Sequence, residues 1–317
     1  MKTIEEFNDY LALKIPEILP DKLNEGLKMK TVTVTKINDR ELHGISFETD
    51  EAEAAPVFYM EDLYEEYLKG AGIDCLAAEA AHMYLCSLLD SHNVKPKELD
   101  FSKAKDHLAL RLLDMRKNVK YLRSLPYINL GYDLALICDI QMDDGKGGCW
   151  RTNVQRGMFE DVMDEKELFE YAFSNVRTID PPVLTSVSRN LNDLSPVDNL
   201  LSTGTRIKAR EKEAFYILTN KYDLLGASVL FYPGIQEEIA DKLGESYYAI
   251  PSSIHEFLIV PESAGLEWHY LRDLVLESNR EVVGSKEALT DKVFYYDYDL
   301  GCFSEACDST VNTSVNS

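Results

Sequence analysis

The sequence lacks both the long apolar segments and the positively charged leader that take proteins to or through a membrane. No uninterrupted apolar stretch approaches the roughly 18 residues of a membrane span. The opening MKTIEEFNDYLALKIPEILP carries acids where a signal peptide would need positive charge. We therefore expect a soluble, cytoplasmic protein with no membrane partner.

Positive charge and clustered cysteine are also scarce. Against 55 Asp and Glu there are only 33 Lys and Arg, which gives a net charge of -22. This balance favours solubility and repels nucleic acid over most of the surface, so it argues against a nucleic-acid partner. The six cysteines are unclustered, so we expect reduced thiols and no disulfide framework.

The strong motifs of cofactor and metal binding are missing as well. The chain has no G-x-x-x-x-G-K-[ST] phosphate loop and no G-x-G-x-x-G dinucleotide fingerprint. The tract DDGKGG fails as a calcium loop, because Ile140 and Met142 stand where acids or amides are required. The sequence therefore predicts no cofactor and no metal.

What the sequence does contain is a mixture of helical and strand patterns in its first half. Apolar spacing predicts helices at 3–14, 60–70, 74–90 and 164–176, and strands at 31–37, 41–47 and 55–60. Two further strands, 133–142 and 149–154, flank DDGKGG and predict a hairpin. From residue 102 the steps of four and three between Leu108, Leu112, Met115, Val119 and Leu122 predict another helix.

The second half alternates more regularly. Residues 186–211 are rich in Ser, Asn, Asp and Pro, which indicates a linker or long excursion. We expect strands at 214–219, 227–232, 247–250, 255–260 and 292–298 and helices at 235–243 and 266–279. The polar tail 301–317 is expected to be disordered.

These patterns predict an α+β protein of more than one domain. At 317 residues with 45% hydrophobic content the chain can form two ordinary domains. We expect a helix-rich N-terminal α+β region with antiparallel hairpins over 1–185 and a C-terminal α+β domain with a mixed sheet over 212–300.

The segment PSSIHE, residues 251–256, offers a nucleophile and a base. On a strand, Ser253 and His255 would face the same side, about 6.5 Å apart between Cα atoms, while Glu256 would face away. In a catalytic triad an acid must bond the base on the side away from the nucleophile. Glu256 is misplaced for this role toward His255, although Asp223 or Asp297 could take it.

The same segment also fits a turn. It lacks the G-x-S-x-G elbow that exposes a catalytic serine. Ser252 and Ser253, after Pro251, are suited to bonding backbone groups, with His255 as a polar residue at the rim. We favour the turn and keep Ser252 or Ser253 with His255 as the catalytic alternative.

Two further clusters suggest binding. Cys75, Glu79, His82 and Cys86 share one helical face, but they span too great a length to surround one ion, so no metal site is predicted. The run 103–123 holds seven basic and two acidic residues. It could contact phosphates, or it could line the polar side of a helix and neutralise acidic neighbours.

Two long segments carry a family resemblance: LLDMRKNVKYLRSLPYINLGYDLALICDI, and the later YILTNKYDLLGASVLFYPGIQEEIADKLGESYYAIPSSIHEFLIVP. Together they resemble an uncharacterised domain-of-unknown-function family of Gram-positive anaerobic bacteria. The C-terminal segment is also similar to a second uncharacterised bacterial family. The resemblance covers about 3–300 and implies a cytoplasmic bacterial protein, without a mechanism.

The resemblance also indicates which residues to examine: Thr219, Asn220, Gly226, Tyr232, Pro233, Gly234, Pro251, Ser252, Ser253, His255 and Glu256. Glycine, proline and asparagine are suited to turns without any chemistry. If the strand ends meet, Asn220, Ser253, His255 and Glu256 could form a small polar cleft that binds a ligand.

Three functions follow as hypotheses. The first is a non-enzymatic interaction or regulatory protein that binds a protein or small ligand through its C-terminal domain. The second is a hydrolase or transferase that uses Ser252 or Ser253 with His255. The third is nucleic-acid binding through 103–123. Whether the chain is an enzyme stays open at this point.

Overall fold

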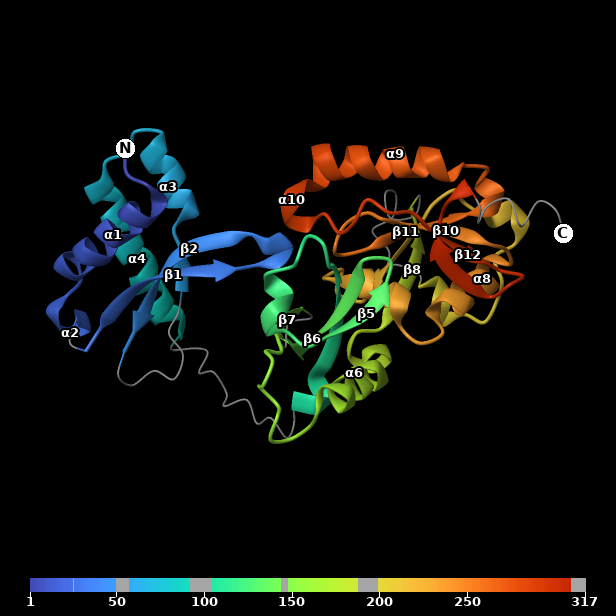
Figure 1. Ribbon diagram of the computed structural model, residues 1–317, viewed down its shortest axis with the longest axis horizontal. Coiled ribbons are helices and arrows are strands. Elements are labelled where there is room, and N and C mark those ends of the chain that lie inside the picture. The colour runs from blue at the N-terminus through green and yellow to red at the C-terminus, as the bar shows by residue number, and fades with distance from the viewer. Residues whose placement is uncertain (25, 50–56, 92–103, 144–147, 188–198, 309–317) are drawn as a thin grey trace. The chain divides into compact units, whose positions relative to one another are not determined.

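The computed structural model describes all residues except 25, 50–56, 92–103, 144–147, 188–198 and 309–317. The chain divides into two compact units, residues 1–99 and 100–317. Each unit is described by itself (Figure 1).

The N-terminal unit combines a small antiparallel sheet with helices. Its sheet has the order β1-β2-β3, in which β1 and β2 form an antiparallel hairpin. Its elements are α1 (Ile4–Ile18), α2 (Asp21–Asn24), β1 (Lys28–Thr35), η1 (Ile37–Asp39), β2 (Glu41–Glu48), β3 (Val57–Tyr59), α3 (Glu61–Leu68) and α4 (Ile73–Ser91). The predicted helices and strands of this region are confirmed.

An apolar core holds this unit together. Helix α1 begins with a capping box, in which Thr3 and Glu6 bond each other's backbone N–H groups. Its inward face then joins residues of the sheet and of α4 in one buried cluster: Phe7, Leu11, Ile15, Leu19, Ile45, Phe47, Met60, Leu63, Leu76, Ala77, Ala80, Ala81 and Tyr84. The rings of Phe47 and Tyr84 stack with centroids 4.4 Å apart.

The C-terminal unit begins with a four-stranded antiparallel sheet. The strands β4 and β5 both pair with the long β6, and β7 pairs with the far end of β6. The elements are η2 (Lys105–His107), β4 (Leu108–Asp114), η3 (Tyr121–Ser124), β5 (Tyr127–Gly131), β6 (Leu134–Asp143), β7 (Cys149–Asn153) and α6 (Glu165–Ile179). The pairing of β6 with β7 confirms the predicted hairpin, whose loop 144–147 lies outside the described residues.

The helix predicted from residue 102 is wrong. Residues 108–114, LALRLLD, form β4, in which every residue is buried. A strand buried on both faces is a continuous apolar run, and periodicity alone does not separate such a run from a buried helix. The basic run 103–123 is therefore divided among a strand, turns and short 3₁₀ segments.

A six-stranded sheet forms the rest of this unit. Its order is β13-β12-β10-β11-β9-β8, and every neighbouring pair is antiparallel. The elements are β8 (Pro182–Ser186), η4 (Leu200–Ser202), η5 (Ala209–Glu211), β9 (Tyr216–Asn220), η6 (Gly226–Phe231), α8 (Ile235–Leu243), β10 (Tyr247–Pro251), β11 (Phe257–Pro261), η7 (Glu262–Ala264), α9 (Trp268–Ser278), η8 (Asn279–Val283), α10 (Gly284–Glu287), β12 (Phe294–Asp297) and β13 (Cys302–Glu305).

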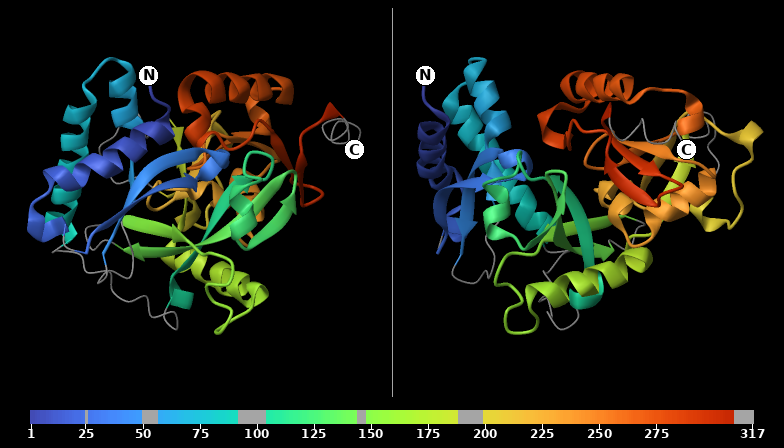
Figure 2. Two further views of the ribbon diagram at one scale, coloured as in Figure 1. Left: turned by 60° about the vertical axis from the view of Figure 1, so that its left-hand side comes forward. Right: turned by 45° about the vertical axis from the view of Figure 1, so that its right-hand side comes forward.

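The α+β class is confirmed, but the predicted mixed sheet is wrong, because all three sheets of the described residues are antiparallel. Helix α9 runs over the six-stranded sheet (Figures 1 and 2). Its Leu271 and Val275 pack with Tyr248, Ile250 and Tyr295 of the strands. Antiparallel neighbours need only short turns, and such turns join β10 to β11 and β12 to β13 in this sheet.

Two other segments differ from their predicted form. Of the predicted strand 227–232, residues 227–231 lie in the 3₁₀ segment η6. The predicted linker or long excursion 186–211, of which residues 188–198 lie outside the described residues, connects β8 to β9, two neighbouring strands of one sheet. Residues 302–305, placed in the predicted disordered tail, form β13, and Phe303 stacks on Phe294 with ring centroids 5.4 Å apart.

Within the described residues, no helix has both the length and the apolar content needed to cross a membrane.

Candidate functional site

The segment 251–256, for which the sequence favours a turn over a catalytic site, forms a turn between β10 and β11. Strand β11 begins only at Phe257, so His255 and Glu256 precede it. The N–H groups of Ser252 and Ser253 donate to the Glu256 carbonyl at 3.1 and 3.4 Å. The hydroxyl of Ser253 accepts from the N–H of His255 at 3.0 Å. Both serines therefore contribute to closing the turn.

The His255 imidazole is bonded to another segment. Its Nδ1 accepts from the backbone N–H of Leu225 at 3.0 Å, so this nitrogen carries no proton. Its Nε2 lies 3.9 Å from the Glu287 carboxylate. Among the described residues the imidazole makes no hydrogen bond to the hydroxyl of Ser253, so this arrangement does not bond a base to a nucleophile.

Asn220 organises the residues that follow β9. Its Oδ1 accepts from the N–H groups of Tyr222 and Leu224 at 3.0 and 3.2 Å, and its Nδ2 donates to the Leu224 carbonyl at 2.7 Å. Residues 220–226, called here the 220–226 loop, are thus closed by one side chain that is 1% exposed. Asn220 and His255 do meet at this loop, and both brace it.

Gly226 is required where the loop meets the turn. A Cβ atom at this position would lie 2.5 Å from Thr219 Oγ1 and 2.7 Å from the Asn220 backbone nitrogen and the His255 carbonyl oxygen. The hydroxyl of Thr219 in turn donates to that carbonyl at 3.0 Å. Only glycine permits this approach without displacement of the backbone.

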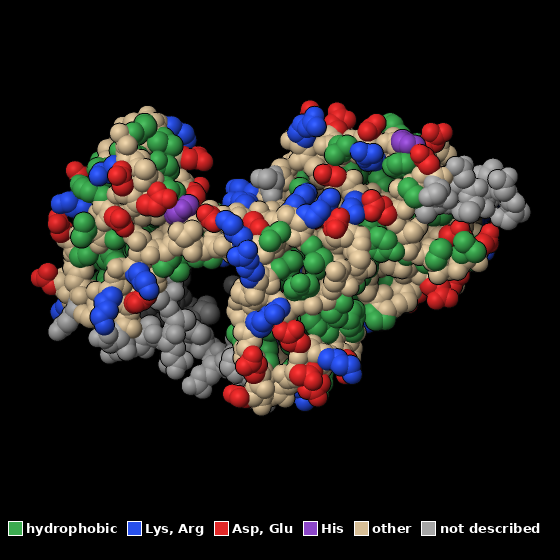
Figure 3. All heavy atoms as spheres, in the orientation of Figure 1, with side chains coloured by type: hydrophobic (Ala, Val, Ile, Leu, Met, Phe, Trp, Pro, Cys, Tyr) green, Lys and Arg blue, Asp and Glu red, His purple; other side chains and the backbone are tan. Residues whose placement is uncertain are grey.

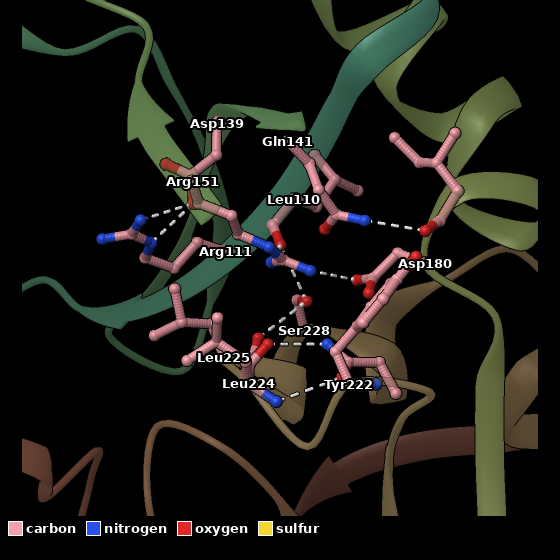
Figure 4. Close-up of polar contacts among 12 residues, drawn as sticks. Leu110, Arg111, Asp139, Gln141, Arg151, Asp180, Tyr222, Leu224, Leu225 and Ser228 are labelled. Atoms are coloured by element: carbon pink, nitrogen blue, oxygen red, sulfur yellow. Dashed lines mark hydrogen bonds and ion pairs between the residues drawn. The ribbon is translucent and has the colours of Figure 1, made fainter. Parts of the chain in front are cut away.

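The braced loop lies beside a buried ionic cluster (Figure 4). Arg111 of β4 pairs with Asp139 of β6, with Nη2 and Oδ2 at 2.6 Å. Arg151 of β7 pairs with Asp180, the C-cap of α6, at 2.7 Å, and it also donates to the Leu110 carbonyl at 3.3 Å.

The pleat of the sheet explains this gathering. Residue Arg151 is opposite Gln141 in the register of β6 and β7, and Arg111 is opposite Ile137. Side chains of opposite residues lie on one face, and residues two apart share it, so Arg111, Asp139, Gln141 and Arg151 all lie on one face of the four-stranded sheet.

Segment η6 completes the cluster. The hydroxyl of Tyr232 donates to Asp180 at 2.5 Å. The hydroxyl of Ser228 lies 2.9 Å from the Leu110 carbonyl and 3.4 Å from the Leu225 carbonyl. The ring of Tyr222 rises from the 220–226 loop toward Asp180 in Figure 4.

Burial dominates the electrostatics of the cluster. It raises the pKa of the Asp139 carboxyl, against the opposing effect of Arg111 and Arg151. It also raises the pKa of the Tyr232 hydroxyl, and the Asp180 carboxylate raises it further. Five buried atoms, Asp139 Oδ1, Gln141 Oε1, Asp180 Oδ1, Arg151 Nε and Arg151 Nη2, have no hydrogen-bond partner in the described part of the chain, although Nη2 keeps its ion pair with Asp180. The cluster therefore carries a high desolvation cost.

A separate hollow lies at the N-terminal end of α9. It has a volume of 370 Å³ and is lined by Tyr248, Gly265, Leu266, Glu267, Trp268, His269 and Asp308. No sequence motif pointed to it, since its residues come from β10, from the turn before α9 and from the chain after β13. In the sequence, only the adjacent aromatic residues Trp268 and His269 next to Glu267 could have indicated this hollow.

The structure describes most of the two other clusters that the sequence singles out. On α4, Cys86 Sγ and His82 Nε2 lie 3.5 Å apart. Within the ranges that the structure describes, no three His, Cys, Asp or Glu side chains are grouped to hold a metal ion. In the run 103–123, Arg111 is buried against Asp139, and Arg116 pairs with Asp114 at 3.1 Å and with Asp133 at 3.4 Å.

Comparison with known proteins gives a family and no activity. No curated protein and no solved structure matches the chain. One family model, described as a family of unknown function (DUF5688), matches residues 4–298. Because this match covers most of both units, the chain belongs to the DUF5688 family.

Proposed function

We propose that the chain is a non-enzymatic binding protein whose C-terminal unit recognises a cationic group of its partner in the hollow at the start of α9. The observation that carries this proposal is the composition of the hollow. Its lining includes two aromatic residues, Tyr248 and Trp268, and two acidic residues, Glu267 and Asp308.

The aromatic wall is held in place by its neighbours. Trp268 opens α9, and its ring stacks on that of His269 with centroids 3.8 Å apart. Tyr248 is 4% exposed, and its ring lies 5.0 Å from that of Tyr295. A cation over the face of a tryptophan or tyrosine ring is attracted by the quadrupole of the ring.

The hollow has two acidic residues, Glu267 and Asp308, and no lysine or arginine among its lining residues. Burial, with smaller effects from Tyr295, Glu262 and Glu267, raises the pKa of Tyr248 to about 12, so its hydroxyl stays protonated at neutral pH. His269 Nε2 lies 3.5 Å from Asp308, which is 79% exposed. Acidic side chains also lie along the edge where α9 runs (Figure 3). The net charge of -22 attracts cations over a longer range.

The size of the hollow limits the ligand. Its 370 Å³ is at the lower end of the roughly 300–1,000 Å³ that small-ligand sites span. This volume suits an ammonium or guanidinium group, either free or at the end of a lysine or arginine side chain. Both sources share the chemistry that the aromatic rings and carboxylates favour.

The test compares two tryptophan variants. Binding of a lysine-rich peptide is measured by calorimetry for the unaltered chain, for Trp268→Ala and for Trp150→Ala, with a serine-rich peptide of equal length as the uncharged ligand. Trp150 lies on β7, is 48% exposed and does not line the hollow, so Trp150→Ala makes the same chemical change at another place. We expect Trp268→Ala alone to lose binding, and equal affinities for all three proteins would overturn the proposal.

The catalytic alternative has less support. To act as a nucleophile, Ser253 would have to give up the hydrogen bond that its hydroxyl accepts from the N–H of His255. To act as a base through Nδ1, His255 would have to give up the hydrogen bond from the N–H of Leu225. A serine-directed fluorophosphonate tests it directly, since labelling that disappears in Ser253→Ala would favour a hydrolase.

A further inference from the structure

The 220–226 loop holds its backbone in an unfavourable conformation. Asp223 and Leu225 have φ values of 51° and 56°. Residues other than glycine rarely adopt this left-handed backbone conformation. They keep it where the surrounding hydrogen bonds hold the backbone in place. Asn220 fixes the centre of the loop with three hydrogen bonds, while His255 fixes its end through the Leu225 N–H.

The bond to His255 depends on the protonation state of the imidazole. Its Nδ1 is the acceptor, so the proton of the neutral ring is on Nε2. A second proton can be added only at Nδ1. The charged ring would then place an N–H donor against the N–H of Leu225, and the bond would be lost.

The carboxyl groups around the ring favour the charged imidazole, while the buried N–H of Leu225 opposes it. Glu287 of α10 lies 3.9 Å from Nε2 and attracts an imidazolium, but its carboxylate is 55% exposed and its effect is screened. Glu256 on the same turn and Asp223 in the loop are the other carboxyl groups of the joined segments. Leu225 is 8% exposed, so protonation of the ring would leave its N–H without a partner in a buried place, which carries a desolvation cost.

The loop borders the ionic cluster. The electrostatic neighbours of the Tyr222 hydroxyl include Asp180 and Arg151. The Leu225 carbonyl lies 3.4 Å from the hydroxyl of Ser228, which also bonds Leu110 beside Arg151. Movement of the loop would therefore weaken the packing on one side of the buried Arg151–Asp180 pair.

We propose that His255 and the 220–226 loop form a proton-sensitive latch, in which the neutral imidazole holds the loop against the Arg151–Asp180 pair and protonation releases it. The latch does not depend on the hollow beside Trp268, since it uses other residues. It gives the chain a conformational response to mild acid, the range in which imidazoles commonly change charge.

Hydrogen exchange measured by mass spectrometry tests the latch. Exchange of the 220–226 backbone is compared at pH 7.5 and pH 5.5 after division by the intrinsic rates. We expect protection to fall at least about tenfold on acidification of the unaltered protein. His255→Asn places an amide oxygen near the position of Nδ1 and does not titrate, so its loop should keep the same protection at both pH values.

The turn at 131–133 is the internal control. Tyr132 and Asp133 also have positive φ, at 57° and 60°, but in the described part of the chain neither is bonded to a histidine; Asp133 pairs with Arg116 and Lys292. Their protection should not change, and α6 peptides report whether a variant remains folded. Protection of the 220–226 loop that is unaffected by pH, or that falls equally in His255→Asn, would overturn the proposal.

Discussion

The buried cores of the two units differ in chemistry. In the N-terminal unit the buried cluster is almost entirely apolar, from Phe7 and Leu11 to Phe47 and Tyr84. The C-terminal unit buries two arginine–aspartate pairs, with Arg151 and Asp180 at 1% and 0% side-chain exposure. Contacts in an apolar core are many and individually weak, whereas a buried ion depends on one partner. The two units should therefore respond differently to single substitutions.

Removal of one ion should have the largest effect. Asp180→Ala leaves Arg151 buried without its partner and removes the acceptor of Tyr232. We expect a loss of about 3–5 kcal/mol in the stability of the C-terminal unit, measured by hydrogen exchange of its slowest amides. Exchange in the N-terminal unit should not change.

The double variant Asp180→Leu with Arg151→Met sharpens this prediction. Replacing both ions by apolar side chains removes the desolvation cost together with the attraction, so most of the stability should return. A double variant no more stable than Asp180→Ala would contradict the account of a mutually dependent pair.

A methyl group at Gly226 should have the next largest effect. The added Cβ would meet backbone atoms of Asn220 and His255 at 2.7 Å, so Gly226→Ala should cost about 1–3 kcal/mol by overpacking. Gly204→Ala is the matched control, since nothing lies within 4 Å of its added Cβ. Equal denaturation midpoints for the two variants would show that the close approach is not required.

A small deletion in the apolar core should cost less. Ile45 is fully buried in the N-terminal unit, and Ile45→Val removes one methylene group. We expect a loss of about 0.5–1.5 kcal/mol in that unit alone, measured by hydrogen exchange. A loss as large as that of Asp180→Ala would remove the distinction between the two cores.

The smallest effect concerns an ion pair near the surface. Burial alone would raise the pKa of Glu245, but hydrogen bonds from Lys212 and Ser263 lower it overall. Its stabilising contribution is therefore present above the unfolded pKa of about 4.3 and is lost as pH falls through the lower folded value.

The variant Glu245→Gln should remove about 0.5–1 kcal/mol at neutral pH and flatten the acid limb of the stability curve. The more exposed Glu170, which pairs with Lys166 at 3.1 Å, is the control. Thermal unfolding from pH 3 to pH 7 measures both variants, and an unchanged acid slope in Glu245→Gln would contradict the assignment.

The sequence predicts most elements because their patterns are local. The capping residues of α1 and α6 and the alternation in β1 are visible without a structure. The segment LALRLLD was misassigned because burial on both faces removes the alternation that identifies a strand.

The functional features were only partly predictable. Asn220, Gly226 and His255 stand out in the sequence, but their role requires knowing that the end of β9 lies beside the start of β11. The pairs Arg111–Asp139 and Arg151–Asp180 are 28 and 29 residues apart in sequence, so only strand register and the end of α6 bring them together. The hollow at Trp268 joins three separate segments and leaves no motif.

The most direct test of the proposed binding function uses the tryptophan of the hollow as the reporter. The chain has two tryptophans, so Trp150→Phe leaves Trp268 as the only one. Its fluorescence is titrated with choline and with 3,3-dimethylbutan-1-ol, a neutral molecule of nearly the same shape. We predict a saturable change with choline and none with the alcohol at equal concentration. Equal responses to both, or no response to choline, would contradict recognition of a cation in this hollow.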